Sequence, residues 1–476
     1  MKEVSDLAYG FYDHETKSLN DHKVFGLVFK QFMAFWTAKT TLWFRGPGAN
    51  TAQGEFKQMV QAIHQAGLGV VMDVVYNHVA DAGKFCFNQI VPEYFSRVMD
   101  DGSYLSNSGC GNDTASERSM VSKYIVDSVL YWAEEYHIDG FRWDLVGLID
   151  VDTINAVMEA VHEVNPNIIF YGEGWEMCSW TSKEGYKDKM TIQPNDKLVA
   201  TEAGVFAFFN DTIRNVIHGG VFTATDKGFV AGNMSAATKE TVTLGYMGNS
   251  NWGSNNSSVD TPLQTVNYAS CHDNYTLFDN LTIDVMDATG CSAEAAFDQA
   301  ADMNSLAAAY YITAQGVPFI HAGEEMLRSK PDAQQESGFN HNSYAAGDVI
   351  NSIKWNTLAD ELVDNAHDYY QGLIAFRKAH PALRMVSAEE VGSHIVNLTG
   401  LDFNVTGFRI LPGANGEENE FVMIFNPRSE ATTVALPEGK WEIFVNDCQA
   451  GLEVLDSAEG AVTVAPISAM VLVKQT

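Results

Sequence analysis

Several apolar runs in this chain end in acidic, histidine or asparagine side chains. Such runs are typical of parallel strands that are buried on both faces and whose carboxyl ends line one site. We therefore predict that the ends of these runs meet at one pocket. The clearest runs are GLGVVMDVVYNH (67–78), the first half of HIDGFRWDLVGLID (137–150), NIIFYGEGW (167–175) and TVNYASCHDN (265–274).

Helical patterns alternate with these runs. Phe56, Met59, Val60 and Ile63 recur at helical spacing, and the pattern ends near Gly67. A helix followed by a strand, repeated with short turns, predicts βα units around a parallel sheet. Further helices are predicted over residues 116–136, 152–164, 292–316 and 356–380.

The predicted strands point to a barrel. Their centres lie near residues 74, 142, 170, 207, 268 and 319, which makes six, where a (β/α)8 TIM barrel has eight. The other two would precede Glu55, in a stretch without helical spacing or strand alternation. After Pro381, short β-rich runs separated by turn residues predict an antiparallel β-sandwich.

The predicted fold class is therefore α/β, with a (β/α)8 barrel that is incomplete at its first two strands and a C-terminal antiparallel β-sandwich. The predicted domains are an irregular or degraded amino-terminal segment (1–54), the barrel (55–381) and the sandwich (382–476). Since a barrel closes only when every strand is present, we expect the chain as written to be less stable or less active than a relative with an intact amino terminus.

Composition limits the classes of partner. The chain has 476 residues and a net charge of −32, and this charge argues against nucleic acid or an anionic membrane because an acidic surface repels phosphate. A neutral ligand such as a sugar is compatible with it. Neither a signal core nor a run long enough to span a membrane is present, so we expect a cytoplasmic protein, with secretion open if the amino terminus is truncated. Six cysteines without metal-binding spacing predict reduced thiols.

The polar ends of the runs carry the candidate chemistry. Arg142 and Asp144 are two residues apart, so in a strand they share a face while Trp143 points the other way. An arginine beside a carboxylate keeps it ionised, as a nucleophile requires, although a structural ion pair has the same pattern. Glu173 and Asp273 end two of the other runs, and these partners favour the catalytic interpretation.

A long polar connection over residues 79–115 leaves the carboxyl end of a predicted strand, on the side of the pocket. Long loops at that position are usually functional. Asn112, Asp113 and Glu117 either order this loop or cap the helix that follows.

Four motifs, VVMDVVYNH, GFRWDLVGL, YGEGW and YASCHDN, resemble in order and spacing the signature regions of the α-amylase superfamily of glycoside hydrolases. The segments SGCGNDTASERSMVSKYIVDSVLYWAEEYHIDGFR, AFFNDTIRN, QGVPFIHAGEEMLRSK and NSYAAGDVIN are similar to type I pullulanases, which are debranching enzymes. The resemblance covers roughly residues 55–476. Trp143 replaces the usual phenylalanine, and the first fifty residues contain neither the family's carbohydrate-binding domain nor its WGYDP-like segment.

The resemblance implies a retaining hydrolase of α-1,6-glucosidic linkages in pullulan, starch or glycogen-derived branched glucans. It implies that Asp144 is the nucleophile and Glu173 the general acid and base, a role that needs a raised pKa. Asp273 would bind sugar hydroxyls and favour the distorted transition state. The implied substrate-binding residues are Arg142, His78, His272, Asn77, Asp73, Asn274 and Trp175.

Two alternatives remain. A glucan branching or transferring enzyme would share all four motifs, and an inactive glucan-binding remnant would fit the missing strands. No cofactor or metal is required by these residues. Calcium near Asn77 occurs among relatives, and the sequence leaves such an ion open.

Overall fold

The computed structural model describes residues 12–13, 18–19, 52–99, 101–175, 177, 205–221, 226–249, 259 and 261–474. The chain divides into two compact units, of which the first ends at Phe209 and the second begins at Asn210. Before residue 52 the structure describes a short antiparallel pair, β1 (Tyr12–Asp13) and β2 (Ser18–Leu19). The two barrel strands predicted before Glu55 fall in a stretch that otherwise lies outside the described residues. The predicted domain boundaries stay a prediction.

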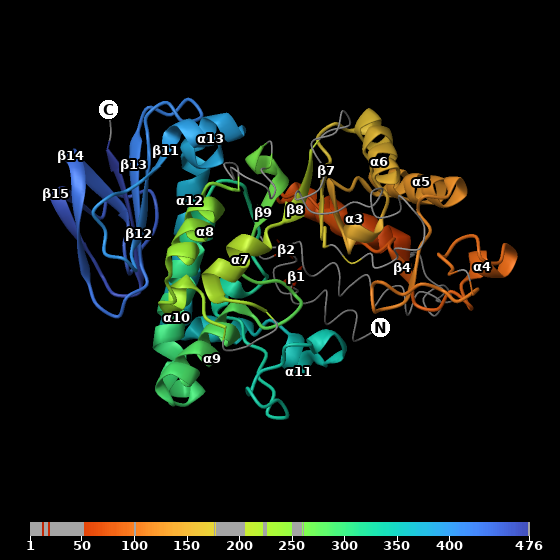
Figure 1. Ribbon diagram of the computed structural model, residues 1–476, viewed down its shortest axis with the longest axis horizontal. Helices are drawn as coiled ribbons and strands as arrows, with labels where there is room; N and C mark the ends of the chain where they lie inside the picture. Colours follow the sequence, from red (N-terminus) through yellow and green to blue (C-terminus); the bar gives the residue numbers. More distant parts are fainter. Residues whose placement is uncertain are drawn as a thin grey trace. The chain divides into compact units, whose positions relative to one another are not determined.

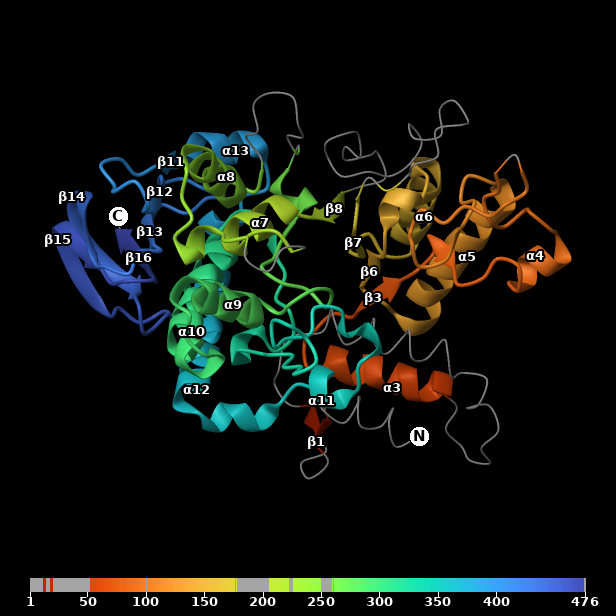
Figure 2. The same ribbon diagram turned by 60° about the horizontal axis from the view of Figure 1, so that its bottom comes forward.

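The first unit contains a parallel sheet with the strand order β3-β6-β7-β8. All four strands and the helices around them were predicted from the sequence. Helices α5 and α6 run side by side along the sheet (Figure 2). The elements are α3 (Ala52–Gln65), β3 (Val71–Val74), β4 (His78–Val79), α4 (Cys86–Ile90), β5 (Asn112–Asp113), α5 (Ser119–Tyr136), β6 (Gly140–Trp143), α6 (Val151–Val164), β7 (Ile169–Gly172) and β8 (Phe206–Phe209).

Strand alternation divides this sheet into an apolar and a polar face. Trp143 is buried in the core that β6 shares with α3, α5 and α6. Arg142 points the other way, and the register sets it beside Asp73 of β3 and Tyr171 of β7. The predicted separation of Arg142 from Trp143 is thus confirmed, and the polar face is the one that can hold a site.

The second unit begins with helices around the parallel pair β9 (Thr265–Asn267) and β10 (Val317–Pro318). The sequence reading missed four of its helices, which are α8, α9 and the shorter α11 and α13. Helix α9 is buried almost all round between Leu277 and Val285, so it shows no amphipathic stripe. Helix α8 is short and rich in alanine and threonine. The helices are α7 (Asp211–His218), α8 (Ala236–Tyr246), α9 (Leu277–Thr289), α10 (Ala293–Thr313), α11 (Asp348–Asn351), α12 (Glu361–Ala379) and α13 (Ala388–His394).

The same unit ends in an antiparallel sheet with the order β11-β12-β13-β16-β14-β15, drawn in blue in Figure 1. One face packs on α8, α10 and α12, where the rings of Tyr246 and Phe408 stack with centroids 4.1 Å apart. The other face forms a separate core around Trp441. Its strands are β11 (Ile395–Asn397), β12 (Thr406–Ile410), β13 (Glu420–Asn426), β14 (Thr432–Val445), β15 (Asp456–Val464) and β16 (Ser468–Lys474).

Among the helices that the structure describes, none is both long and apolar enough to cross a lipid bilayer.

Gly372 lets α12 approach the loop after β14 closely. A Cβ at this position would lie 1.9 Å from the carbonyl oxygen of Ala450. We therefore expect Gly372→Ala to lower the free energy of unfolding by about 1–3 kcal/mol, although alanine favours helices. Gln371→Ala, at the exposed neighbouring position, should change it by less than about 0.5 kcal/mol. Urea unfolding measures both, and equal stability of the two variants would contradict the close packing.

Candidate active site

A single guanidinium binds three carboxylates in the first unit. Arg142 is only 3% exposed. Its Nη1 donates to Asp73 Oδ1 at 2.8 Å and to Asp144 Oδ1 at 3.0 Å, while its Nη2 donates to Glu173 Oε1. Arginine suits this position because its planar fork donates in several directions at once and keeps its charge when buried.

The sheet register brings Asp144 and Glu173 together. They follow directly after the neighbouring strands β6 and β7, and the Glu173 amide donates to the Trp143 carbonyl at 3.0 Å. Gly172 permits this approach, since a Cβ there would lie 2.6 Å from the Trp143 oxygen. Both carboxyl groups therefore bind one guanidinium.

The backbone after Asp144 turns sharply to complete the contact with Glu173. Leu145 has φ 40° and ψ 48°, in the left-handed region. This conformation costs a non-glycine residue about 1–3 kcal/mol, and it aims the Leu145 amide at Glu173 Oε2, 3.1 Å away. The strained turn thus gives Glu173 a partner for each of its oxygens.

Asn77 connects Asp144 to His78. Its Nδ2 donates to Asp144 Oδ2 at 3.1 Å and also to the Asp144 carbonyl. Its Oδ1 accepts from His78 Nδ1, which places the ring proton on that nitrogen. Asn77 is 0% exposed, so its contacts are with these protein groups.

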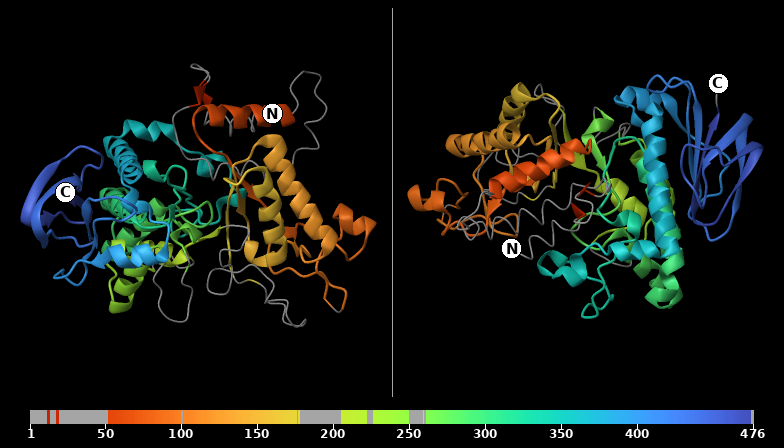
Figure 3. Two further views of the ribbon diagram at one scale, coloured as in Figure 1. Left: turned by 90° about the horizontal axis from the view of Figure 1, so that it is seen from above. Right: turned by 180° about the vertical axis from the view of Figure 1, so that it is seen from behind.

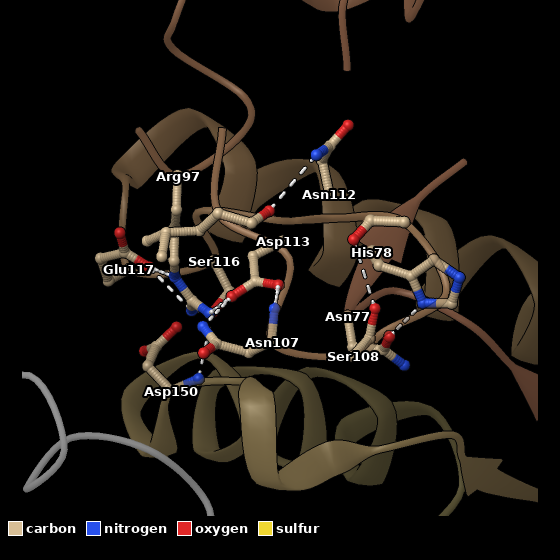
Figure 4. Close-up of polar contacts among 12 residues, drawn as sticks. Asn77, His78, Arg97, Asn107, Ser108, Asn112, Asp113, Ser116, Glu117 and Asp150 are labelled. Atoms are coloured by element: carbon tan, nitrogen blue, oxygen red, sulfur yellow. Dashed lines mark hydrogen bonds and ion pairs between the residues drawn. The ribbon is translucent and has the colours of Figure 1, made fainter. Parts of the chain in front are cut away.

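The loop after β3 is ordered by a buried ion cluster (Figure 4). His78 pairs with Asp113 across the β4–β5 ladder. The Asp113 carboxylate accepts from Asn107 and lies 3.7 Å from Arg97, and Arg97 also binds Glu117 at 3.1 Å.

This cluster decides between the two roles predicted for Asp113, Glu117 and Asn112. The N-cap residue of α5 is Arg118, and its side chain makes no capping hydrogen bond. Asn112 instead accepts from the Ala82 amide at 2.9 Å within the loop. These residues therefore order the loop, and through β4 they hold His78.

The remaining predicted site residues are divided between the two units. Trp175 is half-buried and lies in the first unit, just beyond Glu173. His272, Asp273 and Asn274 belong to the second unit. There the Asp273 side chain is 62% exposed, with its Oδ1 3.4 Å from His272 Nε2.

Asp73, Asn77 and Arg142 are all buried and bind other protein groups. Their role in substrate binding stays a prediction. The sequence reading missed the Leu145 amide, Tyr171 and Arg97. Tyr171 could have been found, since it precedes Glu173 by two residues on the same strand face. Arg97 had no signal, because its partners lie in an irregular loop.

Within the described ranges, one group of acidic and histidine side chains is close enough together to bind a metal ion. Asp364, His367 and Asp368 on α12 could reach one ion, and none of the predicted site residues belongs to that group. The calcium ion considered near Asn77 therefore stays a prediction. Cys86, Cys110, Cys271, Cys291 and Cys448 are free thiols, as predicted.

Known proteins match this chain over most of its length. Residues 394–449 match the family described as the all-beta domain of pullulanase. The pullulanase of Bacillus subtilis is 36% identical over 349 residues, which are 73% of this chain and 45% of that protein. The solved pullulanase from Bacillus acidopullulyticus has a TM-score of 0.78 at 35% identity and covers 88% of this chain and 48% of that one.

A second solved structure is the pullulanase from Paenibacillus barengoltzii in complex with maltohexaose and α-cyclodextrin. Its TM-score is 0.77 at 33% identity, over 90% of this chain and 62% of that one. The chain thus spans less than two thirds of the length of these relatives.

The likeness to these structures assigns the chain to the (β/α)8 class with a C-terminal antiparallel β domain. This fold, with carboxylates grouped around an arginine at strand ends, is consistent with the α-amylase superfamily. Within that superfamily the chain is a homologue of the pullulanases, and the resemblance seen in its motifs is confirmed.

Replacing Arg142 tests how far the first unit depends on it. Arg142→Met would remove the cation that Asp73, Asp144 and Glu173 share, and we expect the free energy of unfolding to fall by about 3–5 kcal/mol. Arg428→Met is the control, because Arg428 pairs with Asp402 and Glu430 near the surface and should contribute less than about 1 kcal/mol. Urea unfolding measures both. A loss at Arg142 no larger than at Arg428 would contradict the dependence.

Proposed function

We propose that this chain is a debranching glycoside hydrolase, which cleaves α-1,6-glucosidic linkages in pullulan, starch or glycogen-derived glucans with retention of configuration. The observation that carries the proposal is the binding of Asp144 and Glu173 to one buried guanidinium at the ends of adjacent strands. The likeness to named pullulanases supports the linkage.

In the first step a carboxylate oxygen of Asp144 attacks the anomeric carbon and forms a glycosyl ester. The bond to the leaving oxygen breaks, and Glu173 gives that oxygen its proton. In the second step Glu173 removes a proton from water, which attacks the same carbon and releases Asp144. Two inversions give net retention.

The surrounding groups prepare the two acids for these steps. Arg142 and Asn77 each bind one oxygen of Asp144, which fixes the orientation of the nucleophile before the sugar arrives. The Leu145 amide orients Glu173 in the same way. In this proposal Arg142, Asn77 and Asp73 do not react with the sugar. They act by orienting the carboxyl groups of Asp144 and Glu173.

The roles of the exposed residues rest on their motifs. Asp273 would bind sugar hydroxyls and stabilise the oxocarbenium-like transition state, with Asn274 supporting it. His78 and His272 would donate hydrogen bonds to the same glucose, and Trp175 would contact the substrate beside Glu173.

Substrate and compartment complete the proposal. Solved relatives are described as complexes with maltose, maltotriose, maltotetraose or maltohexaose, and an uncharged glucan suits a chain with a net charge of −32. The five free thiols among the described residues favour a reducing, cytoplasmic compartment.

Pullulan digestion tests the reaction. We expect maltotriose as the product, first released as the α-anomer, because the α-1,6 bonds are cleaved with retention. Chromatographic sizing identifies the product, and NMR of the freshly released sugar gives its configuration. Longer chains with new branches would favour a branching or transferring enzyme. Binding of pullulan without any product would favour an inactive glucan-binding protein.

Asp144→Asn tests the nucleophile. The change is nearly isosteric, so we expect the fold and glucan affinity to be kept while kcat falls by about a thousandfold or more, which is about 4 kcal/mol of barrier. The same substitution at Asp127, an exposed partner of Lys123 on α5, should leave kcat unchanged. Steady-state rates on pullulan decide. Near-normal turnover of Asp144→Asn would rule out the assigned role.

A further inference from the structure

The segment between β9 and α9, residues 270–274, carries His272 and Asp273 in the second unit. His272 Nε2 lies 3.4 Å from Asp273 Oδ1. Burial lowers the pKa of Lys330, and Asp273 is near enough to that lysine to raise it. A carboxylate that is 62% exposed takes its position largely from the backbone that carries it. The anchors of this segment, called the Asp273 segment below, therefore decide where the carboxylate lies.

A buried glutamate holds the first end of the Asp273 segment. Ser270 Oγ donates to Glu324 Oε2 at 2.7 Å. Tyr311 of α10 and Tyr370 of α12 donate to Glu324 Oε1 at 2.7 and 3.0 Å. Helices α10 and α12 lie side by side in both views of Figure 3, so Glu324 ties the end of the strand to two rigid helices.

The chemistry of the donors fixes the direction of these bonds. Arg328 can only donate, so His321 Nε2 accepts from it at 3.1 Å and the ring proton lies on Nδ1. That nitrogen is 3.3 Å from Ser270 Oγ. The serine therefore accepts from His321 and uses its own proton for Glu324. The hydrogen bonds of the Ser270 hydroxyl group therefore have one possible direction.

Glu324 is costly to keep at this place. It is 3% exposed, and burial raises its pKa to about 7 in spite of the hydroxyl groups that donate to it. Glu325 beside it raises the pKa further. A carboxyl group buried at such a cost suggests a role beyond filling space.

A buried lysine holds the other end. Asn274 has φ 63°, in the left-handed region, and its carbonyl accepts from Lys330 Nζ. Lys330 is 1% exposed, and its own amide donates to Asp279 Oδ2 of α9 at 2.8 Å. The Lys330 backbone is thus fixed to α9, and its ammonium binds the carbonyl of the left-handed turn at Asn274.

We propose that Glu324 and Lys330 are positioning residues that fix the two ends of the Asp273 segment and thereby set the place of the Asp273 carboxylate. The catalytic part of this inference rests on the function proposed above. The anchoring part stands on contacts within the second unit and can be tested without any reaction.

Cys271 is a native probe inside the segment. Its half-buried sulfur lies 3.1 Å from His272 Nδ1. Cys291, a second half-buried thiol just before α10, serves as the internal reference. In Glu324→Gln and Lys330→Met we expect iodoacetamide to alkylate Cys271 about tenfold faster, since loss of one buried hydrogen bond shifts a local opening by that order. The rate at Cys291 should not change. Peptide mapping gives each rate separately.

The kinetic readout is the division between kcat and KM on pullulan. Misplacing a group that acts in the transition state should lower kcat about ten- to hundredfold and change KM less than about twofold. Rates are expressed per folded molecule, with the folded fraction taken from circular dichroism. A purely structural role would lower the folded fraction and leave kcat alone.

Two controls carry the same substitutions at other positions of the second unit. Glu453→Gln changes an exposed acid in the turn before β15. Lys354→Met removes a second lysine, whose Nζ makes no hydrogen bond to the described residues. Both should keep the alkylation rate of Cys271 and the kcat of the unchanged chain.

Ser270→Ala keeps the test valid if Glu324→Gln folds poorly. It removes the hydroxyl between Glu324 and the segment, so it should reproduce the effect on Cys271, and the double variant should add nothing further. Unchanged alkylation of Cys271 in all three single variants would overturn the anchoring. Faster alkylation with normal kcat would overturn the link to Asp273. An unchanged chain without activity on pullulan would instead overturn the proposed function, and the Cys271 rates would still decide the anchoring.

Discussion

The first unit depends on one buried positive charge that is shared by three carboxylates. Without Arg142, the carboxyl groups of Asp73, Asp144 and Glu173 would lie close together in a buried site without the cation that they share. The guanidinium can serve all three because its donors lie in a plane and point in fixed directions. The same bonds that make the charge tolerable also orient the carboxyl oxygens.

That constraint reaches into the backbone. The alternation of β6 must place Arg142 on the polar face while Trp143 fills the helix-facing core. The strand β7 must come close enough for Glu173 to reach the same guanidinium, which requires a glycine at position 172. The chain must then turn through a left-handed residue at Leu145 so that the second glutamate oxygen has a donor. The geometry of the acids therefore depends on how the strands of the sheet pack.

The sequence predicts the parts of this arrangement that repeat. Period-two alternation separates Arg142 from Trp143, and apolar runs locate every described strand of the first unit's parallel sheet. The features that the sequence does not predict depend on contacts that follow no periodic pattern of residues. The Arg97 cluster joins residues of an irregular loop, the Leu145 turn leaves no mark in residue type, and α9 is buried on all sides, so it shows no stripe. The side-chain contacts of Glu324 come from three segments far apart in sequence, at Ser270, Tyr311 and Tyr370. The first fifty residues, where two barrel strands were expected, lie almost wholly outside the described part.

The acids of the proposed reaction are held in two different ways, and electrostatics explains the difference. Asp144 and Glu173 are buried, so each needs a charged or strongly polar partner on its own oxygens. Asp273 is largely exposed and keeps much of its hydration, so it needs no cation of its own. Asp273 needs a fixed position more than it needs a charged partner. The contacts of Ser270 with Glu324 and of Asn274 with Lys330 fix the backbone on both sides of it. A positively charged partner on Asp273 would weaken its attraction for the positive charge that develops on the sugar. Lys330, whose pKa burial lowers and the nearby Asp273 carboxylate raises, donates its hydrogen bond to the Asn274 carbonyl, so the ammonium holds the backbone and the oxygens of Asp273 stay available to the sugar.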